Sequence, residues 1–170
     1  MRIGFRPLTA DELPLLYEWL QRQHIQRWWT DRETYDEVVQ HYLPAIEGSE
    51  PTDLYLILSD GLPVGFIQTY RVSDYPEYRD LVAVEEGVAG VDLFVAEPDL
   101  TGRGFGSEAL RRFVADIVFS DPEIHACVAD PDAENIASLR AFEKAGFRVV
   151  RRFVDPDDQD KLHALLRLDR

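Results

Sequence analysis

An amphipathic helix pattern runs over Gly104–Val118, shortly after a strand-like apolar run that ends at Val95. Its apolar residues fall on one helical stripe, while Arg111 and Arg112 lie off that stripe. Strand-like and helix-like runs alternate elsewhere as well. Seven strands are predicted, at Ile3–Pro7, Leu54–Ser59, Leu62–Arg71, Gly87–Val95, Ile124–Ala129, Phe147–Val154 and Leu162–Leu168. Helices between such strands require a mixed sheet with helices on its faces, so we predict an α+β fold, an α/β sandwich.

Capping signals locate the other predicted helices. Thr9–Glu12 has the form of a capping box, and apolar residues follow it at helical spacing. Thr30–Glu33 has the same form and predicts a second helix, which Pro44 ends. Another helix is predicted over Asn135–Ala145, closed by Gly146 at the C′ position.

Length and composition are those of one globular domain. The chain has 170 residues, of which 45% are hydrophobic and 29% charged, so we expect a single domain spanning residues 1–170. The longest apolar run, 54–58, falls far short of the ~20 residues of a transmembrane helix, and no apolar signal-peptide core is visible. The single cysteine, Cys127, cannot form an internal disulfide. We expect a cytoplasmic protein that does not bind membranes and is a monomer or weak dimer.

Acidic residues outnumber basic ones by 32 to 18, which gives a formal net charge of −14. Such a surface repels phosphates, so nucleic-acid binding is excluded as a function class. The acids gather in three stretches, Val72–Asp99, Asp121–Glu134 and Asp155–Asp160. One interpretation is a surface that keeps the protein soluble, and the other is a pocket for a polycationic ligand onto which the stretches converge. Charge alone leaves both interpretations open.

A glycine-rich turn, Thr101–Gly106, opens the amphipathic helix. Glycines let the backbone come close to a ligand, and the free N–H groups of a first helical turn bind anions. A dinucleotide-binding fingerprint would need glycine where the chain has Ser107, and a P-loop would need a Gly-Lys-Ser/Thr step, whereas no lysine precedes Lys144. What remains is a turn suited to a pyrophosphate, although turn chemistry alone also explains the glycines.

Several motifs resemble a known family. Gly102-Arg103-Gly104-Phe105-Gly106, followed by Asn135 and by Phe142-Glu143-Lys144-Ala145-Gly146-Phe147, resembles the GNAT superfamily of acyl-CoA N-acyltransferases. Blocks similar to those of aminoglycoside 6′-N-acetyltransferases are Leu16-Tyr17-Glu18-Trp19-Leu20, His24-Ile25 with Trp28-Trp29, Tyr42-Leu43-Pro44, Pro63-Val64-Gly65-Phe66 with Gln68 and Tyr70, Gly90-Val91-Asp92, and Asp130-Pro131. The resemblance covers residues 16–150, and siderophore-type acyltransferases share much of its tryptophan-containing N-terminal pattern. It implies a GNAT-like domain with a splayed central sheet.

The same resemblance implies acetyl-CoA as the acyl donor and assigns residues to it. Backbone N–H groups of the glycine turn would hold the pyrophosphate, the pantetheine arm would pair with the end of the strand before the turn, and Asn135 would bond to the arm from the other side. Gly87 and Gly90 suit such a splay. The predicted acetyl-CoA contacts are Leu93, Phe94, Val95, Thr101, Gly102, Arg103, Gly104, Phe105, Gly106, Ser107, Asn135, Ser138, Phe142 and Lys144.

Asp92 is the catalytic residue that the resemblance implies. An amine arrives mostly as an ammonium ion, which has no lone pair for attack on a thioester, and a carboxylate both attracts this cation and takes its proton. The alternative is a strand-end aspartate in a salt bridge or turn. Predicted substrate contacts are Trp28, Trp29, Tyr55, Gln68, Tyr70, Glu77, Asp92, Asp130 and Asp157. Glu77, Asp130 and Asp157 fall one in each acidic stretch, which favours the polycation interpretation.

Two positions depart from the superfamily pattern. Thr101 stands where relatives commonly have Arg or Gln, so one phosphate contact is weaker or replaced. Phe142 stands where relatives often carry the tyrosine thought to protonate the departing thiolate, and phenylalanine cannot donate a proton. Acid catalysis contributes ~10²–10⁴-fold, yet a thiol of pKa ~8.5 is a tolerable leaving group. We therefore expect a slower enzyme, or one that uses solvent or another donor such as Ser138.

The predicted function is transfer of an acetyl group from acetyl-CoA to an amine of a polycationic small molecule, the 6′-amine of an aminoglycoside antibiotic. The histidines show no metal-ligand spacing, so no metal is expected. Three alternatives stay open: acylation of a hydroxylysine-type siderophore precursor, acetylation of protein N-termini, and a non-catalytic module that binds acyl-CoA or a cation. The excess of acids argues against siderophore precursors, which carry fewer positive charges, while Phe142 and Thr101 motivate the non-catalytic module.

Overall fold

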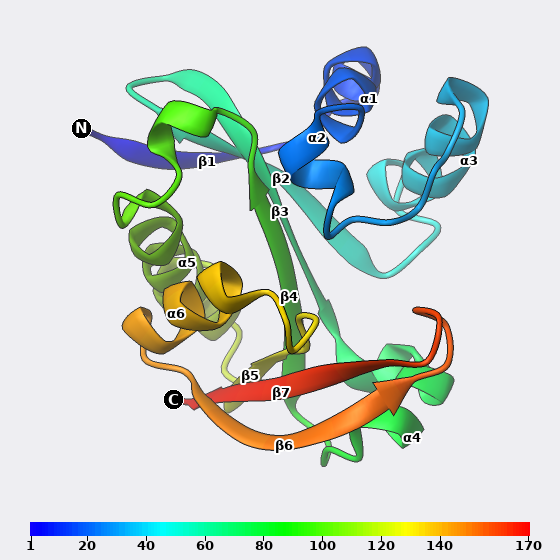
Figure 1. The fold of residues 1–170 in the computed structure, drawn as a ribbon, viewed down its shortest axis with the longest axis vertical. Helices are drawn as coiled ribbons and strands as arrows, with labels where there is room; N and C mark the ends of the chain where they lie inside the picture. The colour runs from blue at the N-terminus through cyan, green and yellow to red at the C-terminus, as the bar shows by residue number, and fades with distance from the viewer. The chain divides into compact units, whose positions relative to one another are not determined.

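The computed structural model describes all residues from 1 to 170 and contains one seven-stranded mixed sheet, with the strand order β1-β2-β3-β4-β5-β7-β6 (Figure 1). The strands are β1 (Ile3–Pro7), β2 (Thr52–Ser59), β3 (Leu62–Arg71), β4 (Val88–Val95), β5 (Ala126–Ala129), β6 (Arg148–Asp155) and β7 (Lys161–Asp169). The α-helices are α1 (Leu13–Leu20), α2 (Gln23–Gln26), α3 (Tyr35–Ile46), α4 (Pro76–Val82), α5 (Phe105–Asp116) and α6 (Ile136–Lys144). The predicted α+β fold is confirmed. None of these helices combines the length and the apolar composition that crossing a bilayer requires.

The chain forms two compact units, each with its own core. The first unit consists of residues 1–68 and 93–99, and the second of residues 69–92 and 100–170. Strands β3 and β4 each pass from one unit into the other. Buried aromatic and aliphatic side chains fill the first core, and the second unit likewise buries aliphatic side chains together with aromatic ones such as Phe113, Phe142 and Phe153.

Local sequence signals build the first unit largely as predicted. The capping box over Thr9–Glu12 is present and leads into α1, whose Trp19 is buried with its ring edge-on to Phe94. Strand β1 pairs antiparallel with β2, and the turn that joins β2 to β3 places Asp60 and Gly61 at φ of 50° and 83°. Positive φ at both central residues is the geometry that a two-residue hairpin turn needs.

The predicted start and end of α3 are wrong. The capping box forms at Thr34 and Glu37, not at Thr30: the Glu37 N–H donates to Thr34 Oγ1 at 3.3 Å, and Glu37 Oε1 accepts from the Thr34 N–H at 3.1 Å. Pro44 does not end the helix, which continues to Ile46. A proline in the last turn removes only one hydrogen bond of the helix, and the Pro44 carbonyl still accepts from the Ser49 N–H at 2.9 Å.

The second unit contains the remaining sheet pairings. Strand β4 runs parallel to β5, and β7 pairs antiparallel with both β5 and β6. Helix α5 buries the predicted stripe from Phe105 to Val114 but ends at Asp116, not at the predicted Val118. Helix α6 is followed by Gly146 at φ 104°, as predicted. The Phe147 N–H donates to the Phe142 carbonyl at 3.0 Å, which completes a Schellman motif. Strand β5 begins at Ala126 instead of Ile124, because the Ile124 N–H is already bonded within a turn to the Asp121 carbonyl at 3.1 Å.

Two short helices were not predicted. Helix α4 lies in the first acidic stretch, where charged residues leave too few apolar positions for a stripe. Its start carried one usable signal, because Pro76 is the first helical residue and proline is favoured there. It ends at Ala83, which has a left-handed φ of 54°. Helix α2 spans only Gln23–Gln26, too short for any periodicity.

Candidate active site

The glycine turn has the backbone geometry of an anion-binding helix start. Gly102 and Gly104 have φ of 71° and 83°, which glycine adopts without strain, and Gly104 is the N-cap of α5. Residues 101–104 are exposed, as Arg103 must be to reach a phosphate. The Ser107 hydroxyl donates to the Gly104 carbonyl at 3.0 Å and fixes the first turn. The N–H groups of this first turn have no partner within the helix, so they can bind a pyrophosphate.

Helix α6 carries the second group of predicted acetyl-CoA contacts, and several of them have structural roles. Asn135 is the N-cap, and its Oδ1 accepts from the Ser138 N–H at 3.2 Å, which leaves the Asn135 amide nitrogen to donate to a ligand. The Phe142 ring is only 4% exposed and lies edge-on to Phe147, with ring centres 5.1 Å apart. Lys144 is exposed in the last turn. Phe142 therefore belongs to the packing of this helix.

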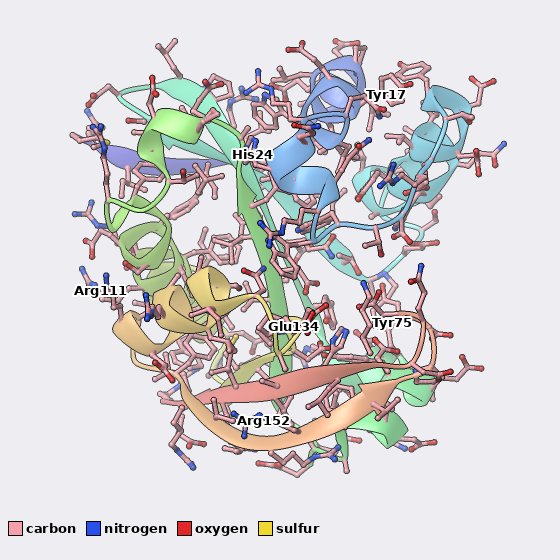
Figure 2. All side chains as sticks on the ribbon, viewed as in Figure 1. Tyr17, His24, Tyr75, Arg111, Glu134 and Arg152 are labelled. Atoms are coloured by element: carbon pink, nitrogen blue, oxygen red, sulfur yellow. The ribbon has the colours of Figure 1, made fainter.

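The end of β4 lies in the first unit. The pairing of β4 with β5 covers Val88–Gly90, opposite residues 126–128, whereas β4 continues to Val95. The Phe94 ring is buried and packs against Trp19 and Trp29, so only its backbone can face an added strand. The Val95 carbonyl accepts from Nε2 of His24, labelled in Figure 2, at 3.1 Å.

Asp92 lies among buried tyrosines of the second unit. Burial raises the pKa of Tyr70 well above its usual value, and the nearby carboxylates of Asp92 and Asp130 raise it further. Burial likewise raises the pKa of Tyr78, with added contributions from Tyr70 and from both carboxylates. Burial and the Asp92 charge also raise the pKa of the Cys127 thiol, which excludes a reactive thiolate there. Three groups near Asp92, the side chains of Tyr70, Tyr78 and Cys127, therefore stay neutral at ordinary pH.

The Tyr70 ring occupies the space over Gly90. A Cβ atom at Gly90 would lie 2.4 Å from Tyr70 Cζ, so this glycine permits the close approach that the sequence predicted for it. The ring lies edge-on to Tyr75 and to Tyr78, with centres 5.4 and 6.0 Å apart. These three tyrosines form one aromatic group next to Asp92.

An acidic pocket opens beside these tyrosines, with a volume of about 880 Å³. One wall comes from the residues before and within α4, and the other from the end of β6 and the turn after it. The lining residues are Asp74, Tyr75, Pro76, Glu77, Tyr78, Leu81, Asp155, Pro156 and Asp157. Four carboxyl side chains and two aromatic rings around one hollow are suited to a ligand with several positive charges. Glu77 and Asp157 of the predicted substrate contacts are among the lining residues, and Asp130 is not.

Asp130 is engaged inside the protein. The Tyr78 hydroxyl donates to Asp130 Oδ1, and Nδ1 of His163 lies 3.0 Å from Asp130 Oδ2 and 2.7 Å from the Asp130 carbonyl oxygen. Nε2 of His163 lies 2.7 Å from Asp158 Oδ2. Burial alone would lower the pKa of His163, but its hydrogen bonds with Asp130 and Asp158 outweigh this and raise the pKa to about 9. The imidazole is therefore a cation at neutral pH.

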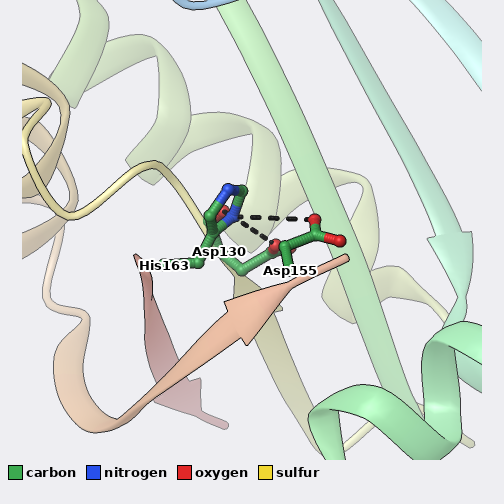
Figure 3. Close-up of side chains that lie close together, drawn as sticks. All are labelled: Asp130, Asp155 and His163. Atoms are coloured by element: carbon green, nitrogen blue, oxygen red, sulfur yellow. Dashed lines mark hydrogen bonds and ion pairs between the residues drawn. The ribbon is translucent and has the colours of Figure 1, made fainter. Parts of the chain in front are cut away.

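The sequence analysis missed this cluster. His163, like the other histidines, lies at no metal-ligand spacing, and no sequence pattern predicts a role in the site for Tyr78, Asp155 or Asp158. Asp130, Asp155 and His163 place one possible ligand atom each within 4.8 Å of one another (Figure 3). A protonated imidazole has no lone pair for a metal, and both ring nitrogens already face carboxylates, so an ion-pair cluster fits these residues better than a metal site.

The other predicted substrate contacts lie in the first unit. The Trp29 ring is half-buried and packs edge-on against the core residues Phe66 and Phe94, with centres 5.9 and 5.1 Å apart. Trp28 is half-buried, with the Arg27 guanidinium 4.9 Å above its ring. Tyr55 on β2 and Gln68 on β3 are half-buried. Partial burial leaves Trp28, Tyr55 and Gln68 a surface that a ligand can reach.

The fold and the site define a group-transfer enzyme with an anion-binding glycine turn and an acidic pocket. A family model described as an acetyltransferase (GNAT) domain matches residues 9–154, and the chain belongs to this family. It is an acetyl-CoA-dependent N-acetyltransferase by this membership, and the predicted resemblance is confirmed.

Named relatives agree with this family. Aminoglycoside N(6′)-acetyltransferase type 1 of Klebsiella pneumoniae is 32% identical over 158 residues, which cover 91% of this chain and 78% of that protein. The crystal structure of aminoglycoside acetyltransferase AAC(6′)-Ib in complex with coenzyme A and kanamycin matches with a TM-score of 0.88 and 30% identity, over 99% of this chain and 95% of that chain. Lysine N-acyltransferase MbtK of Mycobacterium tuberculosis is 26% identical over 95% of this chain and 76% of that protein.

Proposed function

We propose that this protein transfers the acetyl group of acetyl-CoA to the 6′-amine of aminoglycosides. The observation that carries the proposal is the acidic pocket, in which Asp74, Glu77, Asp155 and Asp157 surround one hollow together with two tyrosines. Aminoglycosides are polycations, and a ring of carboxylates collects a multiply charged guest better than a singly charged one. The relatives named for aminoglycoside acetylation support the same substrate class.

Acetyl-CoA is the donor in this proposal. Its pyrophosphate is held by the first-turn N–H groups of α5, from Phe105 to Ser107, with Thr101–Gly104 wrapped around it. The pantetheine arm pairs with the backbone of Leu93–Val95, and the Asn135 amide nitrogen donates to it. Ser138 and Lys144 of α6 contact the arm, and the buried Phe142 supports this helix by packing against Phe147. The family match over residues 9–154 supports treating residues 1–170 as one catalytic domain.

Asp92 acts as the general base. Its carboxylate accepts a proton from the substrate ammonium, directly or through one water, and the freed nitrogen lone pair attacks the thioester carbonyl carbon. The tetrahedral intermediate then loses the second proton of its nitrogen to solvent and breaks its C–S bond, which leaves the neutral N-acetyl product and coenzyme A thiolate. Tyr70 and Tyr78 beside Asp92 stay neutral, so they do not repel a protonated amine that the Asp92 carboxylate attracts.

Protonation of the departing thiolate needs no tyrosine here. Phe142 is buried against Phe147 and has no proton to give, so the proton comes from solvent or from Ser138, one helical turn earlier. A thiol of pKa ~8.5 leaves without strong acid assistance. The enzyme is therefore expected to be slower than relatives that carry a tyrosine at this position.

A lysine-type substrate is the second candidate, since the similarity to lysine N-acyltransferase MbtK extends over most of the chain. Four carboxylates around the pocket favour the polycation over a lysine derivative with fewer positive charges. We further propose a cytoplasmic location, which the buried free thiol of Cys127 fits, since free thiols are usual in a reducing compartment. A monomer or weak dimer stays a prediction.

Release of free thiol from acetyl-CoA tests the proposal, with kanamycin, an Nε-hydroxylysine and a peptide N-terminus compared side by side. We expect turnover with kanamycin to exceed the other two. Asp92→Asn is expected to lower kcat ~10²–10⁴-fold while acetyl-CoA binding is retained, and exposed Asp99→Asn is the matched control. Equal turnover in Asp92→Asn would refute its role. Binding of acetyl-CoA without thiol release from any amine would establish a non-catalytic module instead.

A further inference from the structure

The turn that carries one wall of the acidic pocket is strained. Asp155 and Asp157 line the pocket, and the turn continues through Gln159 and Asp160 to β7. Gln159 and Asp160 have φ of 54° and 55°, two consecutive left-handed residues that are not glycine. Such a conformation costs free energy and persists only where neighbouring contacts fix it. Within the turn, the Asp157 N–H donates to Asp155 Oδ1 at 2.9 Å, the Asp158 N–H to the Asp155 carbonyl at 3.2 Å and the Lys161 N–H to the Asp158 carbonyl at 3.0 Å.

His163 adds a side-chain contact that ties this turn to the rest of the second unit. Its Nε2 lies 2.7 Å from Asp158 Oδ2, and its Nδ1 lies 3.9 Å from an oxygen of Asp155. Lys161 adds weaker attraction, with its Nζ 3.7 Å from Asp158 and 3.9 Å from Asp132. The His163 side chain is only 10% exposed, so its pairing with Asp158 is poorly screened by water.

The other wall of the pocket, formed by α4, is connected to the His163 imidazole through Asp130. Tyr78 of α4 lines the pocket and donates its hydroxyl to Asp130 Oδ1, while His163 Nδ1 lies 3.0 Å from Asp130 Oδ2. Both oxygens of this carboxylate are therefore engaged, and the Asp130 side chain is 12% exposed. A continuous chain runs from Tyr78 through Asp130 and His163 to Asp158, joining the two walls behind the pocket.

We propose that His163 is a positioning residue that holds the two walls of the acidic pocket at the spacing a polycationic substrate requires. In this proposal Asp130 connects His163 to the wall formed by α4 and does not bind the substrate. The substrate class rests on the proposed function, whereas the bridge between the walls does not. The groups that face the imidazole are Asp130, Asp155 and Asp158, with Tyr78 and Lys161 next to them and the Phe153 ring 5.9 Å away.

A role as a counter-charge alone predicts the opposite effect on binding. If His163 only neutralised carboxylates, its replacement by a neutral residue would make the pocket more negative, and the KM for a polycation would fall. If it positions the walls, replacement frees the strained turn and leaves Asp130, Asp155 and Asp158 to repel one another, so the KM rises. The sign of the change in KM separates the two roles.

The test measures kanamycin and acetyl-CoA kinetics for His163→Leu and His163→Gln, with His125→Gln as the control because His125 is an exposed histidine outside the cluster. We expect His163→Leu to raise the KM for kanamycin about tenfold, with kcat and the KM for acetyl-CoA within about threefold. His163→Gln, which keeps one donor, is expected to restore part of the loss. A lower or unchanged KM for kanamycin in His163→Leu would overturn the proposal.

Two further measurements keep the outcome decisive. Tyr78→Phe removes only the hydroxyl that ties α4 to Asp130, and it is expected to raise the KM for kanamycin. In the double variant with His163→Gln, the increase is expected to be smaller than the two single effects combined, because both residues act through Asp130. Amide hydrogen exchange of the unliganded protein is expected to quicken in His163→Leu at residues 157–161 and also at residues 77–81. Faster exchange in the turn alone would overturn the bridge. If the wild-type protein does not acetylate kanamycin, the substrate proposal fails while hydrogen exchange still decides the bridge.

Discussion

The Nε2 atom of His163 lies 2.7 Å from a carboxylate oxygen of Asp158, a residue of the turn that carries the pocket wall. On the other side of the ring, Nδ1 lies 3.0 Å from Asp130 Oδ2. An imidazole with carboxylates at both nitrogens keeps its proton, which is why its pKa rises from 6.5 to about 9 in spite of burial. The positive charge is part of the folded structure and ties its stability to pH.

The first prediction concerns this pH dependence. The pKa of His163 is higher in the folded than in the unfolded chain, so its stabilising effect is complete below pH 6.5 and is lost as the pH rises through about 9. The shift corresponds to at most ~3 kcal/mol. Urea unfolding of wild type and His163→Gln between about pH 6 and pH 9.5 is expected to show the stability difference shrinking as pH rises. Parallel curves for the two proteins would contradict it.

Gly90 gives a second prediction, because its missing side chain makes room for Tyr70. A Cβ atom there would lie 2.4 to 2.7 Å from two ring atoms and the hydroxyl oxygen of Tyr70, so Gly90→Ala must displace the tyrosine group beside Asp92. We expect a loss of ~1–3 kcal/mol in the free energy of unfolding, measured in urea. Gly4→Ala is the matched control on another strand, because a Cβ atom at Gly4 would lie 3.9 Å from its nearest neighbour. A change of more than ~0.5 kcal/mol in the free energy of unfolding of Gly4→Ala would undermine the comparison.

The start of α3 gives a third prediction. Thr34→Ala removes the side chain that accepts from the Glu37 N–H and is expected to cost ~1 kcal/mol of stability. Amide exchange at Glu37 and Val38 is expected to quicken, because these N–H groups bond to the Thr34 side chain and carbonyl. Thr30→Ala, at the position that the sequence pattern favoured, should leave exchange at these two amides unchanged. The reverse result would place the helix start at Thr30.

The sequence was informative wherever one local pattern had one structural solution. The stripe of α5 and the glycine after α6 both fold as their patterns predict. The start of α3 was not decided locally, because Thr30–Glu33 and Thr34–Glu37 satisfy the same capping rule and only the packing of Val38 and Tyr42 selects the second. Helix α4 has no apolar stripe in its sequence. It forms because tertiary contacts such as those of Tyr78 stabilise it.

The candidate site was likewise predictable from the sequence only in part. Convergence of the three acidic stretches on one pocket was one of two interpretations of the charge. Glu77 of the first stretch and Asp157 of the third line the pocket, whereas no residue of the second stretch, 121–134, does. The fate of Asp130 could not be predicted, because its partners Tyr78 and His163 lie 52 and 33 residues away and only the fold brings them together. A histidine in a strand gives no sign by itself of being held between carboxylates.

The pocket carboxylates give the last prediction. Glu77 and Asp157 lie on opposite walls, so Glu77→Gln and Asp157→Asn each remove one negative charge from the hollow while keeping the shape of the side chain. An exposed ion pair contributes ~0.2–1 kcal/mol, so each change should raise the KM for kanamycin ~2–5-fold and the double variant about tenfold. The KM for acetyl-CoA should not change. Glu134→Gln, at an exposed acid outside the pocket that is labelled in Figure 2, is the control.

Salt dependence separates attraction by these charges from a change of shape. The wild-type KM for kanamycin should rise with ionic strength, because salt screens charges in an open pocket, and this slope should flatten in the double variant. A flattened slope together with a raised KM is the signature of lost attraction. A double variant whose KM and slope both match the wild type within about twofold would mean that the substrate binds elsewhere, since removing two of the four carboxylates from an occupied pocket cannot leave the binding of a polycation unaffected.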